Sequence, residues 1–243
     1  MESPFLSVIV PAYNEELRIA DSIDQLCSYL SNMSYSWELI VVNDGSDDKT
    51  AKIVDDMTKG NGHLRLINAT HQGKGAAVKL GMLTAKGKWR FLSDADLSMP
   101  PSNICRFFSG PNGIPNFDVS IGSREIIGSK RFDEPLSRHI LGRIYNWTVK
   151  LIVVRGIEDT QCGFKMYSAE AAETIFSLQR LNGWGYDVEN LFLANKIGLS
   201  IGEIPIDWRY HSGGKMTLAG SINGYFEIFR VRLNHLLGRY RRH

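Results

Sequence analysis

The sequence predicts an α/β fold in which a mostly parallel sheet is flanked by helices. Short apolar runs alternate with helical patterns in the first half of the chain, as in parallel strands joined by helices. Polar motifs repeatedly follow these runs, and open sheets of this kind bind ligands at the carboxyl ends of their strands. With 243 residues, of which 43% are hydrophobic, the chain can bury one sizeable core.

The expected elements follow from the hydrophobic periodicity. Strands are predicted at residues 5–11, 37–43, 64–68, 89–93 and 118–123, and helices at 15–31, 47–59 and 75–85. From about residue 136 the pattern becomes helical; a segment at 156–168, a helix at 169–178, a turn at 182–185, a helix at 188–197 and a strand at 201–208 follow.

Composition and charge restrict the class of protein. A net charge of +2 and the lack of an arginine-rich or aromatic-interleaved segment argue against nucleic acid as a partner. Three widely spaced cysteines favour a reducing, cytoplasmic setting. The start Met-Glu-Ser-Pro leaves no room for a signal peptide, and no apolar run reaches about 18 residues. We therefore expect a soluble or peripheral protein on the cytoplasmic face of a membrane.

Asp94 and Asp96 follow the strongest buried-strand pattern of the chain. Residues two apart in a strand project to the same face, so both carboxylates could reach one divalent cation at the strand end. Such a cation would be placed to hold a diphosphate. Two alternatives remain for an isolated pair: a polar strand end with turn-forming acids, or a phosphatase-type aspartyl nucleophile.

Three further motifs precede the aspartate pair. In Pro11-Ala-Tyr-Asn-Glu-Glu16, the two acids could cap a helix, or Tyr13 could stack on a base. In the segment 41–50, Asp47 is the expected N-cap of the next helix, which leaves Asp44 free to accept hydrogen bonds from a base or ribose. Gln72-Gly-Lys-Gly75 could bring a lysine and backbone amides to phosphate, although it lacks the P-loop spacing.

The order of these four motifs resembles the nucleotide-sugar half of inverting family 2 glycosyltransferases, which have the GT-A fold. The segment Asp159-Thr-Gln-Cys-Gly-Phe-Lys165 is similar to one found in dolichyl-phosphate β-glucosyltransferases. The resemblance divides the chain into a GT-A domain at 1–215, with a nucleotide-sugar half at 1–123 and an acceptor half at 124–215, followed by a basic helix at 216–243. Two departures are Ser98, where the family often has Gln, and Ser212-Gly-Gly-Lys215, where it has Gly-Ser-Lys.

The resemblance also implies roles for individual residues. Pro11, Tyr13, Glu15 and Asp44 would hold the nucleoside, with Lys74 nearby. Asp94 would bind ribose and lie near the metal, and Asp96 would coordinate Mg²⁺ or Mn²⁺ directly. Asp187 and Glu189 occupy the place of the base in hydroxyl-accepting relatives, and here would orient the glucosyl hydroxyls, with helix N-capping as the alternative for Asp187.

The acceptor side is expected to be cationic. A lipid phosphate is already an anion at neutral pH, so its transfer calls for cations to hold the reactants and not for a general base. Arg124, Arg138 and Arg143 lie in the most basic region, where residues 124–155 hold seven Arg or Lys against three acids. A solvated surface role is the alternative for each. Trp208, Arg209 and Lys215 are candidates to close over the diphosphate.

Two helices are expected to be amphipathic and basic. The last one carries an apolar stripe flanked by arginines, and residues 136–152 carry a second stripe with Arg143, Asn146 and Lys150 opposite. The C-terminal stripe comprises Ile222, Tyr225, Phe226, Phe229, Leu233, Leu236, Leu237 and Tyr240, between Arg230 and Arg241 on one flank and Arg232 and Arg239 on the other. Such stripes could meet a membrane surface, pack on the core of the protein or mediate homo-oligomerisation.

The sequence thus predicts an inverting transferase that moves glucose from UDP-glucose to a polyprenyl phosphate such as dolichyl phosphate. The alternatives are a GDP-mannose-dependent mannosyltransferase, a family 2 transferase with a sugar hydroxyl acceptor, and a non-catalytic nucleotide-sugar-binding protein at the membrane. Intact Asp94, Asp96, Arg124 and Lys215 favour an enzyme.

Overall fold

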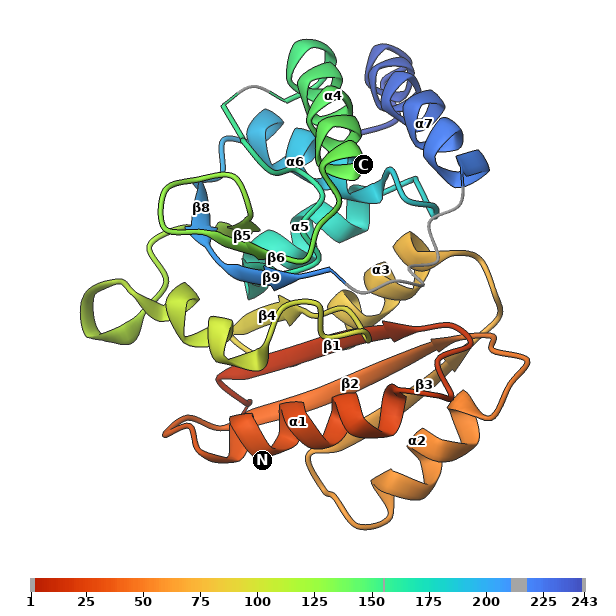
Figure 1. The fold of residues 1–243 in the computed structure, drawn as a ribbon, viewed down its shortest axis with the longest axis vertical. Coiled ribbons are helices and arrows are strands. Elements are labelled where there is room, and N and C mark those ends of the chain that lie inside the picture. Colours follow the sequence, from red (N-terminus) through yellow and green to blue (C-terminus); the bar gives the residue numbers. More distant parts are fainter. Residues whose placement is uncertain (1–2, 155, 211–217, 242–243) are drawn as a thin grey trace.

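A seven-stranded sheet forms the centre of the molecule (Figure 1). The computed structural model describes residues 3–154, 156–210 and 218–241, and for residues 218–223 and 225 the backbone alone. The strand order is β3-β2-β1-β4-β7-β5-β8. The strands are β1 (Leu6–Ala12), β2 (Trp37–Asp44), β3 (Leu64–Ala69), β4 (Trp89–Leu92), β5 (Val119–Ser123), β7 (Lys165–Ser168) and β8 (Ile201–Pro205).

The first four strands form a parallel block with its polar motifs at one edge. β1 pairs in parallel with β2 and β4, and β2 with β3. Every residue of β1 and β2 is buried, which is expected when helices cover both faces of a parallel sheet. The segments that follow β1, β2 and β4 therefore emerge together at the carboxyl edge. This is the arrangement predicted from the sequence.

The helices form layers on the two sides of this block. Helices α1 (Ile19–Ser31) and α2 (Thr50–Thr58) lie on one face, and α3 (Lys74–Thr84) lies on the other (Figure 1). α1 buries Ile19, Ile23, Leu26 and Leu30, whose spacing gives one apolar stripe. α5 (Ala169–Leu178) packs beside α3, and α6 (Tyr186–Lys196) packs on α5.

The second half adds strands of mixed direction. β7 runs antiparallel to both β4 and β5, while β8 is parallel to β5. The predicted strand at 201–208 is divided at Ile206, because its last part, β9 (Asp207–Arg209), leaves the main sheet. It pairs with β6 (Lys130–Phe132) in a small parallel sheet that the sequence did not predict.

Two helices of the second half of the chain lie together. α4 (Leu136–Ile152) and α7 (Leu218–Leu236) are in contact, and α7 also packs on α6 (Figure 1). Within the described ranges, no helix is long and apolar enough to cross a membrane.

Two helices begin later than predicted. α1 starts at Ile19 and α2 at Thr50, not at residues 15 and 47. The intervening loops are tied to each other instead: the Asn14 N–H donates to Ser46 Oγ at 2.9 Å, and the Asp47 N–H donates to Asn14 Oδ1 at 2.9 Å. Asp47 is therefore not the N-cap of α2, and this prediction was wrong.

Candidate active site

The two aspartates of the Asp-Ala-Asp motif lie in a turn immediately after β4, and not in the strand itself. β4 ends at Leu92, and the Leu97 N–H donates to the Asp94 carbonyl at 3.4 Å. Asp96 Oδ1 accepts the Ser98 N–H at 2.9 Å, which fixes the carboxylate at one oxygen. Ser98 thus contributes its backbone to Asp96, at the position where the family often carries Gln.

Asp94 forms an ion pair with Lys74, the first residue of α3. Lys74 Nζ lies 2.6 Å from Asp94 Oδ1, and the ring of Trp184 lies 5.1 Å from the same nitrogen. Burial lowers the pKa of Lys74, but the charges of Asp94, Asp187 and Asp96 outweigh it and raise the pKa above its ordinary value. The structure therefore brings a cation to the aspartate turn, a pairing that the sequence did not predict.

Gly163 allows Asp94 to approach the neighbouring loop closely. A Cβ atom at this glycine would lie 1.9 Å from Asp94 Oδ2, so any larger residue would displace the carboxylate. Gly163 belongs to the 159–165 segment, which therefore packs directly on the aspartate turn. This contact joins the two halves of the chain at the candidate site.

Asp187 is buried in α6 and paired with Lys165, a residue to which the sequence analysis assigned no role. Lys165 Nζ lies 2.6 Å from Asp187 Oδ1 and donates to the Cys162 carbonyl at 2.7 Å, and the lysine side chain is fully buried. Burial raises the pKa of Asp187, whereas the charges of Lys165 and Lys74 lower it. Asp187 lies one residue past the start of α6, whose N-cap is Gly185, so the N-cap alternative was wrong.

Glu189 is not available to orient a sugar. Its Oε2 accepts the N–H groups of Arg180 and Leu181 at 3.0 and 2.8 Å, and its Oε1 accepts the Tyr240 hydroxyl at 2.6 Å. The side chain is completely buried, and burial raises its pKa. These contacts give Glu189 a structural role, so the prediction that it orients glucosyl hydroxyls was wrong.

The predicted nucleoside residues gather at the ends of β1 and β2. Pro11 lies in β1, and the Tyr13 ring that follows is stacked on His71 with centroids 4.2 Å apart. His71 Nδ1 lies 2.9 Å from Asp44 Oδ2. Glu15 Oε2 lies 2.6 Å from Arg18 Nε. An aromatic face and acidic groups thus meet at one edge of the sheet.

Asp44 is not free, in contrast to the sequence prediction. Its two oxygens accept the N–H groups of Gln72 and Gly73, each at 3.0 Å, and only 3% of the residue is exposed. Asp44 therefore shapes the 72–75 segment, and these two amides are not open to phosphate. Of that motif, Lys74 is the group that projects to the aspartate turn.

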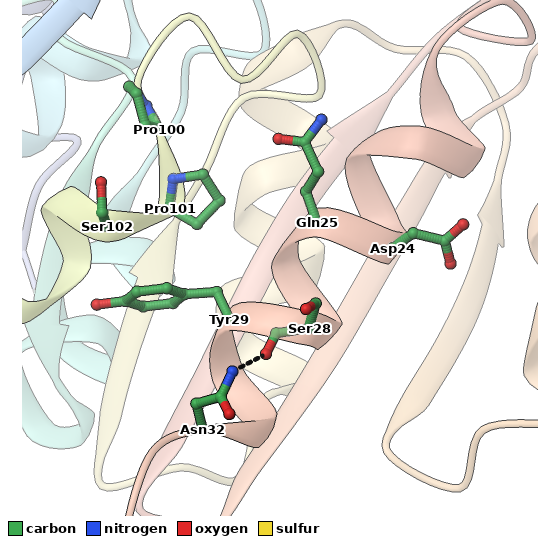
Figure 2. Close-up of a pocket in the computed structure, with 8 residues that line it drawn as sticks. All are labelled: Asp24, Gln25, Ser28, Tyr29, Asn32, Pro100, Pro101 and Ser102. Carbon is green, nitrogen blue, oxygen red and sulfur yellow. Dashed lines mark hydrogen bonds between the residues drawn. The ribbon is translucent and has the colours of Figure 1, made fainter.

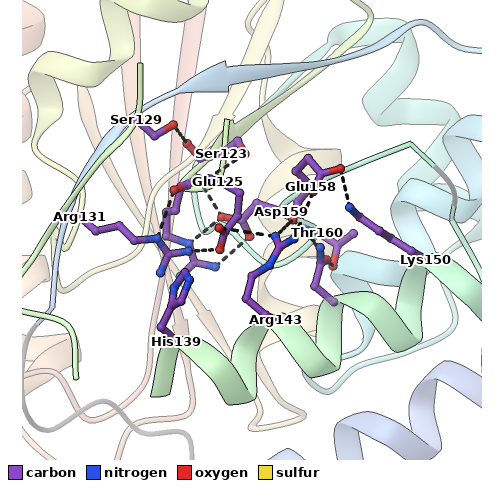
Figure 3. Close-up of polar contacts among 12 residues, drawn as sticks. Ser123, Glu125, Ser129, Arg131, His139, Arg143, Lys150, Glu158, Asp159 and Thr160 are labelled. Carbon is purple, nitrogen blue, oxygen red and sulfur yellow. Dashed lines mark hydrogen bonds and ion pairs between the residues drawn. The ribbon is translucent and has the colours of Figure 1, made fainter. Parts of the chain in front are cut away.

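Two of the predicted acceptor arginines, Arg124 and Arg143, belong to a network of ion pairs between α4 and the segments that precede and follow it. Arg124 Nε and Nη2 donate to the two oxygens of Asp159 at 2.6 and 2.8 Å. Arg143 lies 3.5 Å from Glu125 and 3.4 Å from Glu158. The network also contains Arg131, paired with Glu125 and with Glu134. Figure 3 shows Arg131 and Arg143 beside Glu125, and Lys150 paired with Glu158.

The remaining acceptor candidates lie close to this network. Arg138 lies 4.9 Å from the ring centroid of Tyr210, and the buried Trp208 ring has the guanidinium carbons of Arg124 and Arg131 at 5.3 and 5.8 Å. Arg209 lies over Phe132 at 5.4 Å. Lys215 lies outside the described residues. The structure therefore gathers the arginines but neutralises most of their charge with carboxylates.

The aspartate turn fits a magnesium or manganese ion that is shared with a substrate. Among the residues that the structure describes, no three His, Cys, Asp or Glu side chains are arranged to hold a metal alone. Mg²⁺ typically uses one or two carboxylates together with substrate phosphates and water. Asp96, with one oxygen held by Ser98, and Asp94, with one held by Lys74, provide that kind of donor set.

Two hollows on the surface differ in their relation to this site. The larger one, about 580 Å³, lies between α1 and Pro100–Ser102 and is lined by none of the predicted site residues (Figure 2). The other, about 360 Å³, is lined by Asp44, Gln72, Lys79 and Asn182 among others. Of the predicted nucleoside residues, Asp44 alone lines the smaller hollow.

The sequence of the chain is similar to those of known glucosyltransferases. A dolichyl-phosphate beta-glucosyltransferase of Dictyostelium discoideum is 34% identical, covering 98% of this chain and 77% of that protein. The proteins of the same name from Homo sapiens and Saccharomyces cerevisiae are 32% and 34% identical, covering 97% and 99% of this chain and 77% and 78% of theirs.

The solved structures identify the fold. Glucosyl-3-phosphoglycerate synthase from Mycobacterium tuberculosis, in complex with Mn²⁺, UDP-glucose and phosphoglyceric acid, superimposes with a TM-score of 0.70 at 19% identity, covering 94% of this chain and 79% of that one. The GT-A fold predicted from the sequence is thereby confirmed. Residues 7–176 match the family described as glycosyl transferase family 2. The chain therefore belongs to glycosyl transferase family 2, as its motifs predicted.

Proposed function

We propose that the protein transfers glucose from UDP-glucose to the phosphate of dolichyl phosphate, or of a similar polyprenyl phosphate, with inversion at the anomeric carbon. The observation that carries the proposal is the similarity over almost the whole chain to dolichyl-phosphate beta-glucosyltransferases. Residues 1–123 would bind the donor and residues 124–215 the acceptor.

The donor would occupy the carboxyl edge of the parallel strands. The Tyr13 ring would stack on the base in place of His71. Asp44 would fix one side of the site through its hydrogen bonds with the Gln72 and Gly73 amides. Lys74 would meet the diphosphate beside Asp94. A Mg²⁺ or Mn²⁺ ion held by Asp96 and Asp94 would offset the charge of the leaving diphosphate.

The burial of Asp187 and the orientation of Arg124 favour a phosphate acceptor over a hydroxyl acceptor. A sugar hydroxyl needs a base within reach, but the candidate base Asp187 is buried and held by Lys165 at 2.6 Å. A phosphate needs oriented cations. Asp159 binds Nε and Nη2 of Arg124, so the third guanidinium nitrogen, Nη1, would remain to bind a phosphate. Arg138 would supply a second cation at the same side.

The acceptor proposal also involves a membrane surface. We define the outer apolar surface as the exposed apolar side chains of α4 and of the α7 segment: Leu136, Ile140, Leu141, Ile144, Trp147, Leu151, Phe226, Phe229, Leu233, Leu236 and Leu237. Tyr240, which the sequence placed in the same stripe, is instead buried, and the side chains of Ile222 and Tyr225 lie outside the described residues.

The charges beside this surface favour a lipid bilayer as its binding partner. The exposed arginines 230, 232, 239 and 241 flank the apolar side chains of the α7 segment, while Glu227 is buried on its inner side. Arginines at the edges of an apolar stripe can reach anionic headgroups while the stripe enters the acyl boundary. The protein would thus act as a peripheral enzyme on the cytoplasmic face of the membrane.

The test is a product analysis with two donors. Purified protein, Mg²⁺ or Mn²⁺ and a short polyprenyl phosphate are incubated with UDP-glucose or GDP-mannose, and the lipid is analysed by mass spectrometry. Glucosylated lipid from UDP-glucose alone is the expected result. Mannosylated lipid would overturn the donor proposal, and glycosylation of an added sugar hydroxyl in place of the phosphate would overturn the acceptor proposal.

A further inference from the structure

Glu227 is a buried acid on the inner side of a helix whose outer side is apolar and exposed. It is 4% exposed, whereas its neighbours Phe226 and Phe229 are 64% and 57% exposed. Glu227 Oε2 accepts the N–H of Gly185, the N-cap residue of α6, at 2.5 Å. Burial raises the pKa of Glu227, and the Gly185 hydrogen bond and Arg230 oppose this effect.

Two glycines make room for this carboxylate. A Cβ atom at Gly183 would lie 2.5 Å from Glu227 Oε1, and one at Gly185 would lie 2.5 Å from Glu227 Cβ. Real Cβ atoms do not approach other atoms so closely. A side chain at Gly185 would therefore collide with the base of the Glu227 side chain, and one at Gly183 would displace its carboxylate.

The turn that Glu227 holds leads to the donor side of the candidate site. Between the two glycines, Trp184 places its ring beside Lys74 Nζ, which pairs with Asp94. The Asn182 carbonyl accepts the Ala76 N–H at 3.3 Å, and Gln179 Nε2 donates to the Gly75 carbonyl at 2.9 Å. The 179–185 segment thus connects α7 to the first turn of α3.

A second contact attaches the end of the chain to the same segment. The Tyr240 hydroxyl donates to Glu189, which in turn accepts the N–H groups of Arg180 and Leu181. Arg180 also donates to the Arg239 carbonyl at 3.3 Å. The 179–185 segment is therefore held at one end by Tyr240 through Glu189 and at the other end by Glu227.

We infer that Glu227 is a positioning residue for the donor site: it fixes the 182–185 turn so that Trp184 and α3 hold Lys74 beside Asp94. Glu227 does not touch the substrate; it acts through Gly185. Because the opposite side of α7 carries the outer apolar surface, the helix that would meet the membrane also sets the geometry of donor binding. The kinetic part of this inference rests on the proposed function.

The first experiment compares Glu227→Ala with Glu227→Gln. Glutamine keeps an acceptor oxygen at the same reach, whereas alanine removes it. In the absence of ligand, Glu227→Ala should increase hydrogen exchange at least tenfold in peptides covering both 182–186 and 73–77, and Glu227→Gln should restore the protection of both. Phe229→Ala, which alters the outer side of the same helix, should leave exchange in both peptides unchanged.

The second experiment measures nucleotide affinity. With Mn²⁺ present, Glu227→Ala should weaken binding of UDP at least tenfold and raise the KM for UDP-glucose by a similar factor, with little change in the KM for the lipid. Gly183→Ala, which crowds the carboxylate from the other side, should have the same effect if Glu227→Ala does not fold. Circular dichroism confirms folding of each variant.

The outcomes separate this inference from the proposed function. Unchanged exchange at 182–186 in Glu227→Ala, or a change there without one at 73–77, would overturn the positioning role, as would unaltered UDP affinity. If the wild-type protein binds no UDP, the proposed function fails, and the exchange measurements still decide whether Glu227 positions the first turn of α3.

Discussion

The guanidinium group of Arg124 is bound by both carboxylate oxygens of Asp159, with nitrogen–oxygen distances of 2.6 and 2.8 Å. The Arg124 N–H donates to the same carboxylate at 3.0 Å, so Asp159 fixes both the backbone and the side chain of the arginine. Glu203 accepts the Asp159 N–H at 3.1 Å. An arginine held in this way presents its remaining N–H groups in one direction. This fixed orientation favours phosphate binding over the alternative of a solvated surface side chain.

Asp159→Asn should destabilise the protein at neutral pH. The substitution leaves the partly buried Arg124 without its counter-charge, and the expected loss in the free energy of unfolding is about 3 kcal/mol. Arg124 lowers the pKa of Asp159 to about 2, although burial alone would raise it. Because the folded-state pKa lies below that of the unfolded chain, this stabilisation is present above about pH 4 and is lost as the pH falls toward 2.

Urea unfolding at several pH values checks this prediction. The difference in the free energy of unfolding between the wild type and Asp159→Asn should narrow as the pH falls from 4 to 2. Asp24→Asn, which changes an exposed aspartate on α1, is the control and should show no such narrowing. A difference that is constant across this range would mean that Asp159 does not titrate with the predicted low pKa.

Asp96→Ala should abolish metal-dependent transfer while the fold is retained. Removal of the carboxylate that we propose as a metal ligand should lower kcat by at least about 100-fold, which is the typical effect of losing one electrostatic stabiliser. The measurement is the rate of glucosyl-lipid formation over a range of Mn²⁺ concentrations, with thermal melting as the check on folding. Glu170→Ala, an exposed acid in the first turn of α5, is the control. Full activity of Asp96→Ala would remove Asp96 from the metal site.

The pair of Lys165 and Asp187 gives a prediction that distinguishes structure from chemistry. Lys165→Met leaves Asp187 as an unpaired buried acid and should cost roughly 3–5 kcal/mol in the free energy of unfolding. Lys165→Met combined with Asp187→Leu should recover much of that loss, because buried ion pairs can often be replaced by apolar side chains of similar volume.

Activity then separates the two roles of Asp187. If Asp187 orients the sugar, the double variant should be stable but at least about 100-fold slower in transfer. A double variant with near wild-type kcat would show that the pair serves folding alone. Urea unfolding and initial rates on the same preparations provide both readouts.

The sequence predicted the strands of the first half of the chain well because their signals are local. The strands at 37–43, 64–68 and 89–93 agree with β2, β3 and β4 to within one residue at each end. Continuous apolar runs indicate buried parallel strands wherever they occur. By contrast, β6 and β9 are three residues long and largely lack apolar side chains, so no pattern predicted β6 or the separate pairing of β9, which the sequence analysis included in one strand at 201–208.

The sequence suggested candidate residues for the site, but it did not show which of them form hydrogen bonds or ion pairs with each other. Arg124 and Asp159 are 35 residues apart, and a single sequence does not indicate which carboxylate neutralises which arginine. Likewise, the predicted freedom of Asp44 depended on its place before the next helix, whereas the structure uses its two oxygens to hold the Gln72 and Gly73 amides. Lys165 is the last residue of the Asp159–Lys165 segment, but only the fold shows that its partner is Asp187.

The outer apolar surface gives the last prediction. Phe229, Leu233 and Leu236 are 57%, 52% and 81% exposed on α7. Replacing all three with Ser removes apolar area that would enter the acyl boundary, so binding to vesicles of neutral and anionic phospholipid should weaken at least about tenfold. Vesicle co-sedimentation at increasing lipid concentration measures the change.

A matched triple variant controls for the loss of exposed apolar area as such. Leu17, Ile114 and Ile127 are 96%, 49% and 101% exposed and lie outside α4 and α7, so their replacement with Ser should leave vesicle binding unchanged. Light scattering without lipid tests the competing occupant, a second copy of the chain. If the wild type is a dimer that the α7 triple variant converts to a monomer, and vesicle binding does not change, the surface is an interface between copies and the membrane proposal is wrong.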